Sequence, residues 1–299
     1  MANKLVSLAQ WQAIRVTGED AKKYLNSQLT CDVEALAENR ASFACHCDAK
    51  GKVWSQFYLI VLKDQILLFQ HQSSIEKSLS ELKKFSVFSK VEIIADAKPL
   101  QFFALLGANQ STSQHQVSPQ GSAYRVAMCD NIELIITESA SDAQSISALD
   151  AEENTGDFEQ ALSAAVIPFI TDLHQNTYVP QMLNAHALKG ISFKKGCYLG
   201  QETVARMRYR GGCKKASFAF SANNQVITGS DIEVALGDNW RRSGEVILST
   251  YDAQTNQTRG IAVMPIDSDI SAQYRVKDDS SLQVQLSALP YSLDYEESK

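Results

Sequence analysis

The residues with the clearest potential for chemistry lie in one stretch, Lys194-Lys195-Gly196-Cys197-Tyr198-Leu199-Gly200-Gln201-Glu202. The residues after it, from Thr203 to Arg208, are good helix formers without a breaker, so a helix is predicted to begin near Gly200. Cys197 would then precede a helix N-terminus, where free N–H groups and two lysines favour a thiolate. Cys197 is therefore a candidate reactive thiol. The alternative is a small buried cysteine in a tight connection.

The same stretch lies in a basic segment of an acidic chain. Between Lys189 and Lys215 there are eight lysines and arginines and one acid, Glu202, although the chain carries a net charge of −6. Such a segment suggests a local anionic ligand, such as a phosphate, a polyglutamate tail or a nucleic-acid backbone. A solvated basic helix face is the alternative. The two glycines, Gly196 and Gly200, would let the backbone pass close to another group.

A second cluster of possible ligands is Cys45-His46-Cys47. Alternation along a strand would place Cys45 and Cys47 on one face and His46 on the other. Three successive donors cannot easily turn to one ion, and no second pair with ligand spacing completes a set of four. A structural zinc site is therefore rejected, and no metal site is predicted.

Composition narrows the class of protein. A chain of 299 residues is expected to form two or three domains, and 44% hydrophobic with 21% charged residues is typical of a folded soluble protein. The net charge argues against a protein that coats nucleic acid generally. No apolar run is long enough to span a bilayer and the first seven residues do not form a signal peptide, so a cytoplasmic location with reduced cysteines is predicted. Motifs for nucleotide hydrolysis, nicotinamide binding, zinc peptidases and serine hydrolases are absent.

The elements that must position these residues change along the chain. Up to about residue 145, pairs of strand-like runs alternate with helices, which indicates α+β layers. Residues 107–122 are predicted to be a loop. After the basic segment there are six strand-like runs without a convincing helix, which predicts a small β-barrel. These runs are Ala216–Phe220, Ile232–Leu236, Glu245–Tyr251, Gly260–Met264, Gln273–Val276 and Leu282–Leu286.

The pattern Lys-Gly-Cys-Tyr-x-Gly-Gln-Glu resembles the signature of the YgfZ family. Its members are folate-binding proteins tied to tRNA modification and iron–sulfur enzymes, and they are related to the aminomethyltransferase (T-protein) of glycine cleavage. The resemblance extends to His46–Lys52, Val204-Ala205-Arg206, Asn239–Gly244 and Leu289–Leu293, and thus to nearly the whole chain.

The resemblance implies an α+β fold of three domains in a ring around a central cavity, two mixed α/β domains and a C-terminal β-barrel. Residues 1–44 with 146–200 would form the first domain, residues 45–145 the second and residues 201–299 the barrel domain.

The resemblance also implies a function, that of a folate-binding accessory protein supporting iron–sulfur enzymes, including tRNA-modifying ones. Cys197 would be the reactive centre, accepting or relaying a sulfur, a one-carbon unit or a transient iron contact, and Gln201 and Glu202 would orient the loop or ligand. The expected cofactor is tetrahydrofolate or a one-carbon derivative. Its candidate binding residues are Trp11, Phe158, Lys195, Gly196, Tyr198, Gly200 and Arg206, with Lys194, Lys195 and Arg206 holding negative charge.

The chain departs from the relatives in two places. Ala164-Ala165-Val166 stands where a Glu-Ala-Gly element is expected, so looser recognition of a pterin is predicted. Folate-dependent aminomethyl transfer, the second hypothesis, requires a carboxylate that is absent from residues 51–56. A third hypothesis, from another class, is a tRNA-binding module that uses the basic segment directly.

Overall fold

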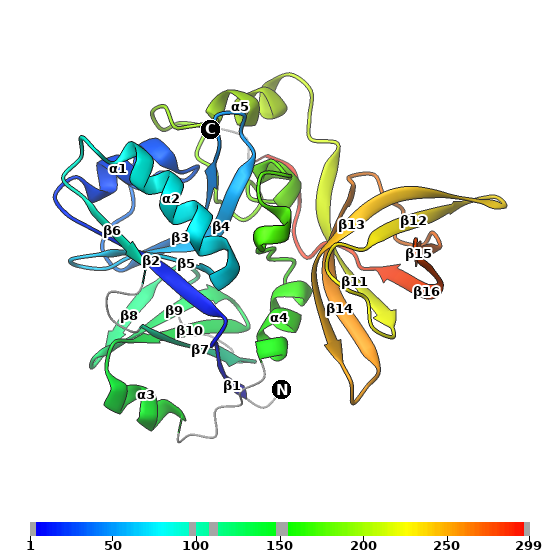
Figure 1. Cartoon of the computed structure of the whole chain (residues 1–299), viewed down its shortest axis with the longest axis horizontal. Helices are drawn as coiled ribbons and strands as arrows, with labels where there is room; N and C mark the ends of the chain where they lie inside the picture. Colours follow the sequence, from blue (N-terminus) through cyan, green and yellow to red (C-terminus); the bar gives the residue numbers. More distant parts are fainter. Residues whose placement is uncertain (1–3, 96–99, 108–112, 148–154, 296–299) are drawn as a thin grey trace.

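The computed structural model describes residues 4–95, 100–107, 113–147 and 155–295. Two β-sheets with their helices occupy one side of the molecule and a β-barrel the other, with helix α4 (Thr155–Ala164) between them (Figure 1). No helix in these ranges is long and apolar enough to cross a membrane.

The first sheet is antiparallel and has the strand order β3-β4-β5-β2-β6. Helices α1 and α2 cover one face, and the second sheet lies on the other. Alternating residues of each strand therefore enter different cores: Phe43 and Cys45 face the second sheet, whereas Ala44 faces the helices. The elements are β2 (Trp11–Thr17), α1 (Ala21–Gln28), β3 (Arg40–Cys47), β4 (Val53–Val61), β5 (Ile66–His71), η1 (Gln72–Ser74), α2 (Ile75–Phe85) and β6 (Glu92–Ala95).

The second sheet has the strand order β1-β7-β10-β9-β8, and α3 packs on its outer face through Ala143, next to Phe103 and Ile135. Of the loop predicted over residues 107–122, residues 108–112 lie outside the described ranges, and the prediction is wrong for the last part, where β8 pairs with β9. The strand was missed because it consists largely of polar residues and contains a proline. Proline is tolerated in an edge strand, where one side of the backbone does not pair with another strand of the sheet. The elements are β1 (Lys4–Ser7), β7 (Gln101–Leu106), β8 (Val117–Gln120), β9 (Ala123–Cys129), β10 (Ile132–Thr137) and α3 (Ala140–Ser147).

The C-terminal part is a closed barrel with the order β11-β14-β13-β12-β15-β16. Five of the six predicted strand-like runs lie within strands of this barrel, and the sixth, Gln273–Val276, begins one residue before β15, so the barrel prediction is confirmed. The strands are β11 (Lys215–Asn223), β12 (Asp231–Leu236), β13 (Asn239–Asp252), β14 (Gln257–Pro265), β15 (Tyr274–Val276) and β16 (Asp279–Leu286). The apolar residues at alternate positions fill its interior.

A long connection links the sheets to the barrel. After α4 it forms the short turns η2 (Asp172–His174) and η3 (Pro180–Leu183), then α5 (Gln201–Tyr209). After the last barrel strand the chain returns to α5 (Figure 1), where the Tyr295 ring packs against the Arg208 guanidinium. The predicted class, mixed α/β layers with a C-terminal barrel, is confirmed. The expected domain boundary after residue 44 falls inside β3, and the first sheet contains strands from both sides of it.

Candidate functional site

The loop that carries Cys197 is fixed against the end of α1 before it enters α5. The backbone N–H of Ser192 donates to the Thr30 carbonyl at 2.8 Å, and that of Leu199 donates to the Ser27 carbonyl at 3.1 Å. The Thr30 hydroxyl in turn donates to the Gly190 carbonyl at 2.6 Å. These bonds hold the loop at both ends, so residues 193–198 are presented from a fixed base.

Lys195 ties the middle of this loop to α1. Its ammonium donates to the carbonyls of Asn26, Leu29 and Cys31 at 2.5, 2.8 and 2.7 Å. Carbonyls at the end of a helix lack partners within it, so a half-buried lysine is a suitable cap. The ammonium also lies 5.0 Å from the ring centre of Tyr198. The three donors of Lys195 are thus occupied by the protein itself, and burial lowers the pKa of Lys195 to about 8.

Two glycines bring the Cys197 loop against the turn before β4. A Cβ at Gly200 would lie 2.4 Å from the Asp48 carbonyl oxygen and 2.8 Å from the Gly51 Cα, and a Cβ at Gly51 would lie 2.9 Å from the Gly200 carbonyl oxygen. The Asp48 carboxylate shapes this turn by accepting the N–H groups of Lys50 and Lys52 at 2.9 and 2.8 Å. The sequence motifs at 46–52 and 194–202 therefore form one structural unit.

The predicted catalytic residues lie together at this unit. All six cysteines are in the described ranges and free, and Cys197 alone is exposed. Gln201 and Glu202 open α5, as predicted from the sequence. The Gln201 amide oxygen accepts the Tyr198 N–H at 3.3 Å, whereas Glu202 points to solvent.

The predicted folate-binding residues are divided between this loop and the core. Gly196 is exposed on the loop, Tyr198 is buried beneath it, and Arg206 is exposed on α5. Trp11 and Phe158 lie elsewhere, in the core between the sheets and α4.

Trp11 and Phe158 contact each other inside an aromatic cluster. Their ring centres are 5.0 Å apart in an edge-to-face arrangement, and Trp11 also stacks on Phe69 and meets Phe169 edge-on at 4.9 Å. Trp11 is 2% exposed and Phe158 0%. As they stand, neither ring offers a free face to a ligand, and Lys195 offers no free donor. The indole N–H of Trp11 is buried and has no hydrogen-bond partner among the residues that the structure describes.

Cys45, His46 and Cys47 alternate across β3 as predicted. The two cysteines enter the core between the sheets, while the His46 Nδ1 lies 3.1 Å from the Ser78 hydroxyl on α2. Among the residues described, no group of three or more His, Cys, Asp or Glu side chains is arranged to hold a metal ion.

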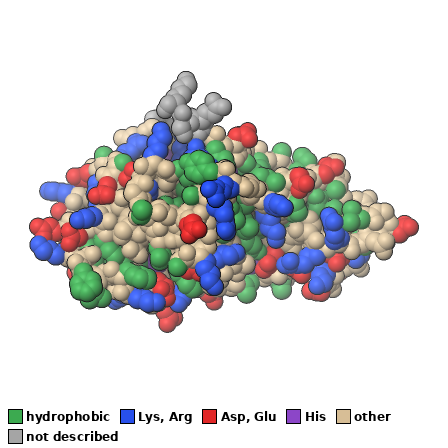
Figure 2. Space-filling view, turned by 90° about the horizontal axis from the view of Figure 1, so that it is seen from above, with side chains coloured by type: hydrophobic (Ala, Val, Ile, Leu, Met, Phe, Trp, Pro, Cys, Tyr) green, Lys and Arg blue, Asp and Glu red, His purple; other side chains and the backbone are tan. Residues whose placement is uncertain are grey.

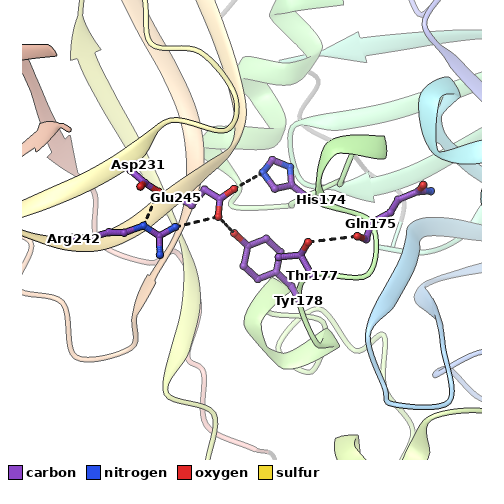
Figure 3. Close-up of polar contacts among 7 residues, drawn as sticks. All are labelled: His174, Gln175, Thr177, Tyr178, Asp231, Arg242 and Glu245. Atoms are coloured by element: carbon purple, nitrogen blue, oxygen red, sulfur yellow. Dashed lines mark hydrogen bonds and ion pairs between the residues drawn. The ribbon is translucent and has the colours of Figure 1, made fainter. Parts of the chain in front are cut away.

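A polar cluster that was not predicted from the sequence joins the barrel to the connection (Figure 3). The carboxylate of Glu245 on β13 accepts the Tyr178 hydroxyl at 2.9 Å and lies 3.2 Å from the His174 Nε2. Arg242 reaches the same carboxylate at 3.5 Å and donates to Asp231 at 2.7 Å. Burial of the His174 ring lowers its pKa, which keeps it neutral beside the carboxylate.

The segment that carries His174 and Tyr178 also pairs with the start of β4. The Val53 N–H donates to the Tyr178 carbonyl, and the Asn176 N–H donates to the Val53 carbonyl, both at 2.8 Å. The Lys52 ammonium donates to the Thr177 carbonyl at 2.6 Å. Residues 51–53 therefore contact both the segment that binds the barrel and, through Gly51, the Gly200 backbone beneath the Cys197 loop.

Comparison with known proteins agrees with this architecture. A family model described as the YgfZ β-barrel domain matches residues 217–279. The "tRNA-modifying protein YgfZ" of Aliivibrio fischeri (strain MJ11) is 39% identical over 300 residues, 97% of this chain and 92% of the relative. The protein of the same description from Colwellia psychrerythraea is 38% identical over 305 residues, 97% of this chain and 93% of the relative.

A solved structure shares the fold at low sequence identity. The glycine cleavage system aminomethyltransferase T from Bartonella henselae has a TM-score of 0.71 at 12% identity, covering 96% of this chain and 86% of its own. This similarity is one of fold.

Proposed function

The chain belongs to the YgfZ family, and from this premise we propose that it is an accessory protein for tRNA modification that supports iron–sulfur enzymes, with Cys197 as its reactive centre. The observation that carries the proposal is the placement of Cys197. It is the exposed cysteine among six free ones, on a loop that α1, the 48–51 turn and α5 hold in place.

The contrast with the other thiols supports this choice. Burial raises the pKa of Cys31 to about 12 and raises the pKa of Cys45 and Cys47 as well. The partly buried Cys129 and Cys213 have raised pKa values for the same reason. A thiol reacts as its thiolate, so these five are poor nucleophiles near neutral pH. Six free cysteines also suit the reducing cytoplasm in which we place this function.

In this proposal the thiolate of Cys197 is the group that contacts a partner or substrate, either as a nucleophile or as a transient ligand of iron. The neighbouring residues have distinct parts. Gln201 orients the loop through its bond to the Tyr198 N–H, whereas Glu202, Lys194 and Arg206 are exposed and available to a partner or ligand.

A folate ligand, tetrahydrofolate or a one-carbon derivative, is the second part of the proposal. It rests on the family and on the aminomethyltransferase-like fold. The side chains do not favour it as they stand, because Trp11 and Phe158 are covered and Lys195 is engaged. A folate at this place would have to uncover the Trp11 ring, and the unpartnered indole N–H would then be a donor for it. We therefore derive no chemical step through folate.

The role of Cys197 is tested with Cys197→Ser, using Cys213→Ser as the matched control. Each variant replaces the gene in cells, and iron–sulfur-dependent tRNA nucleosides are measured by mass spectrometry. We expect Cys197→Ser to lower them to the level of a deletion while the thermal unfolding of the purified protein stays unchanged. Normal nucleosides in Cys197→Ser cells would overturn the assignment.

Folate binding is tested by titrating tetrahydrofolate into the protein and following tryptophan fluorescence, with Trp11→Phe alongside. Phenylalanine preserves most of the aromatic packing, so this variant is expected to fold. Saturable quenching that is lost in Trp11→Phe supports a folate beside Trp11. No quenching at millimolar ligand would remove folate from the proposal and leave the Cys197 part standing.

A further inference from the structure

Helix α5 presents one continuous face to solvent. Glu202, Arg206, Tyr209 and Arg210 are exposed, and their spacing places them along one side of the helix. Val204, on the other side, is fully buried. The face begins at Glu202, five residues after Cys197 in the sequence, and is followed by Gly211-Gly212, both exposed, before the barrel.

This face is rich in unpaired cations. Arg206 and Arg210 lie on it, with the exposed Lys194 before it and Lys214 after it. In the described part of the chain none of these four side chains makes an ion pair, and Glu202 is the one acid among them. Figure 2 looks onto the molecule from the side of α5 and shows Lys and Arg side chains beside a hydrophobic patch. Unpaired cations at this density are a surface for an anionic polymer.

The face also holds an aromatic ring in a fixed position. Tyr209 is 66% exposed. The guanidinium of Arg208 lies 5.2 Å from the Tyr209 ring centre, 4.3 Å from that of Phe193 and 5.2 Å from that of Tyr295. Arg208 and Phe193 therefore support the Tyr209 ring from within the protein while much of the ring remains open to solvent.

Cations and an exposed aromatic ring together favour one kind of partner. Single-stranded nucleic acid is bound by positive surfaces that follow its backbone and by aromatic rings on which bases stack. The bases of a duplex are already stacked and cannot reach a ring on a convex helix, whereas unpaired loops and ends can. An acidic protein surface would use the cations but would gain less from Tyr209.

We propose that the exposed face of α5, with Lys194 and Lys214 at its two ends, binds an unpaired segment of RNA, whose phosphates contact the cations and one of whose bases stacks on Tyr209. The choice of RNA over DNA rests on the proposed function in tRNA modification. Nine helical residues span about 13 Å, so the face accommodates a short stretch of backbone. RNA bound there lies next to the loop that carries Cys197.

The test is fluorescence anisotropy of labelled RNA with the purified full chain, comparing an unpaired oligonucleotide with a duplex of the same sequence. We expect the unpaired RNA to bind more tightly and Tyr209→Ala to weaken its binding about 5- to 100-fold. The double variant Arg206→Gln/Arg210→Gln should weaken binding of any sequence. It should also reduce the slope of log affinity against log salt by about 1.4.

The matched control is Lys23→Gln/Lys83→Gln, which removes two exposed charges from α1 and α2 instead. It should leave RNA binding unchanged within about twofold. Equal losses in both double variants, equal affinity for duplex and unpaired RNA, or no RNA binding would each overturn the proposal. So would loss of an iron–sulfur enzyme's binding in the α5 variants without any loss of RNA binding.

Failure here is distinguishable from failure of the proposed function. Cys197→Ser should bind RNA as the parent does, because Cys197 is not part of the α5 face. If the parent binds no RNA but Cys197→Ser still abolishes tRNA modification in cells, the proposed function stands and the RNA surface falls.

Discussion

At the scale of single residues, the two glycines beside Cys197 have different surroundings. Gly200 has a φ of +82°, and a Cβ there would lie 2.4 Å from the Asp48 carbonyl oxygen, whereas a Cβ at Gly196 would meet no heavy atom within 4 Å. We therefore expect Gly200→Ala to lower the free energy of unfolding by about 1 to 3 kcal/mol. Gly196→Ala should change it by less than about 0.5 kcal/mol. Urea unfolding of both variants measures the difference.

The same pair of variants tests whether the glycine contact positions Cys197. If the loop shifts when Gly200 and Gly51 are forced apart, the rate at which iodoacetamide alkylates Cys197 should change in Gly200→Ala and not in Gly196→Ala. Equal stability and equal alkylation rates in the two variants would show that the contact between Gly200 and Gly51 neither stabilises the fold nor positions Cys197.

Lys195 gives a second prediction at this scale. Lys195→Met removes the donors to three carbonyls at the end of α1 and keeps the apolar stem. The loss in unfolding free energy should be about 2 to 4 kcal/mol, since buried carbonyls are left without partners. Lys194→Met, at an exposed position, is the control and should be nearly neutral. An equal effect of the two variants in urea unfolding would contradict the capping role.

These residues show what local sequence can reveal. Cys197 before a helix start was predictable because Gly200 and the helix formers after it are adjacent in sequence. The partners of Lys195 lie more than 160 residues earlier, so its sequence context indicated only a charge. A helix and a basic segment were predicted here, but only the structure shows that Arg206, Tyr209 and Arg210 are exposed on one side.

At the scale of elements, the barrel strands were predictable because each is a short alternating run between turns. Their closure into one sheet, by pairing of β11 with β16, depends on contacts distant in sequence. The contact between the barrel and the rest of the molecule could not be predicted for the same reason, because Glu245 and His174 are separated by 71 residues. Another such contact is the bond from the Thr250 hydroxyl to the Glu159 carboxylate at 2.7 Å.

The Glu245 cluster predicts how firmly the barrel is docked. Glu245→Gln removes the charge that Tyr178, His174 and Arg242 share and leaves their polar groups imperfectly paired. We expect a loss of about 1 to 3 kcal/mol in unfolding free energy. Trypsin should also cleave faster at the exposed Arg210 and Lys214, because the barrel separates more often.

The control for this prediction is Glu233→Gln. Glu233 pairs with Arg275 at 2.9 Å within the barrel, so its loss should not loosen the docking. If both variants are cleaved by trypsin at the parent's rate, the Glu245 cluster is not what holds the barrel in place.

At the scale of the whole molecule, the histidines make stability depend on pH in one direction. Burial lowers the pKa of all five: to about 4 for His46 and His115, and downward for His71, His174 and His186. Below pH 6.5 the unfolded chain therefore takes up protons that the folded chain does not, and stability falls as the pH falls. Glu159 acts in the opposite direction, since burial raises the pKa of its carboxyl. Because five histidines oppose this single carboxyl group, the net effect is a loss of stability as the pH falls.

The unfolding free energy should thus be greatest above pH 6.5 and decrease steadily towards pH 4, where His46 alone accounts for a loss of about 3 kcal/mol. Urea unfolding at intervals between pH 7.5 and 4 measures the slope. His46→Gln retains a polar group for Ser78 but does not titrate, so its slope should be shallower than the parent's. Parallel slopes for parent and His46→Gln would mean that this ring is not held neutral in the fold.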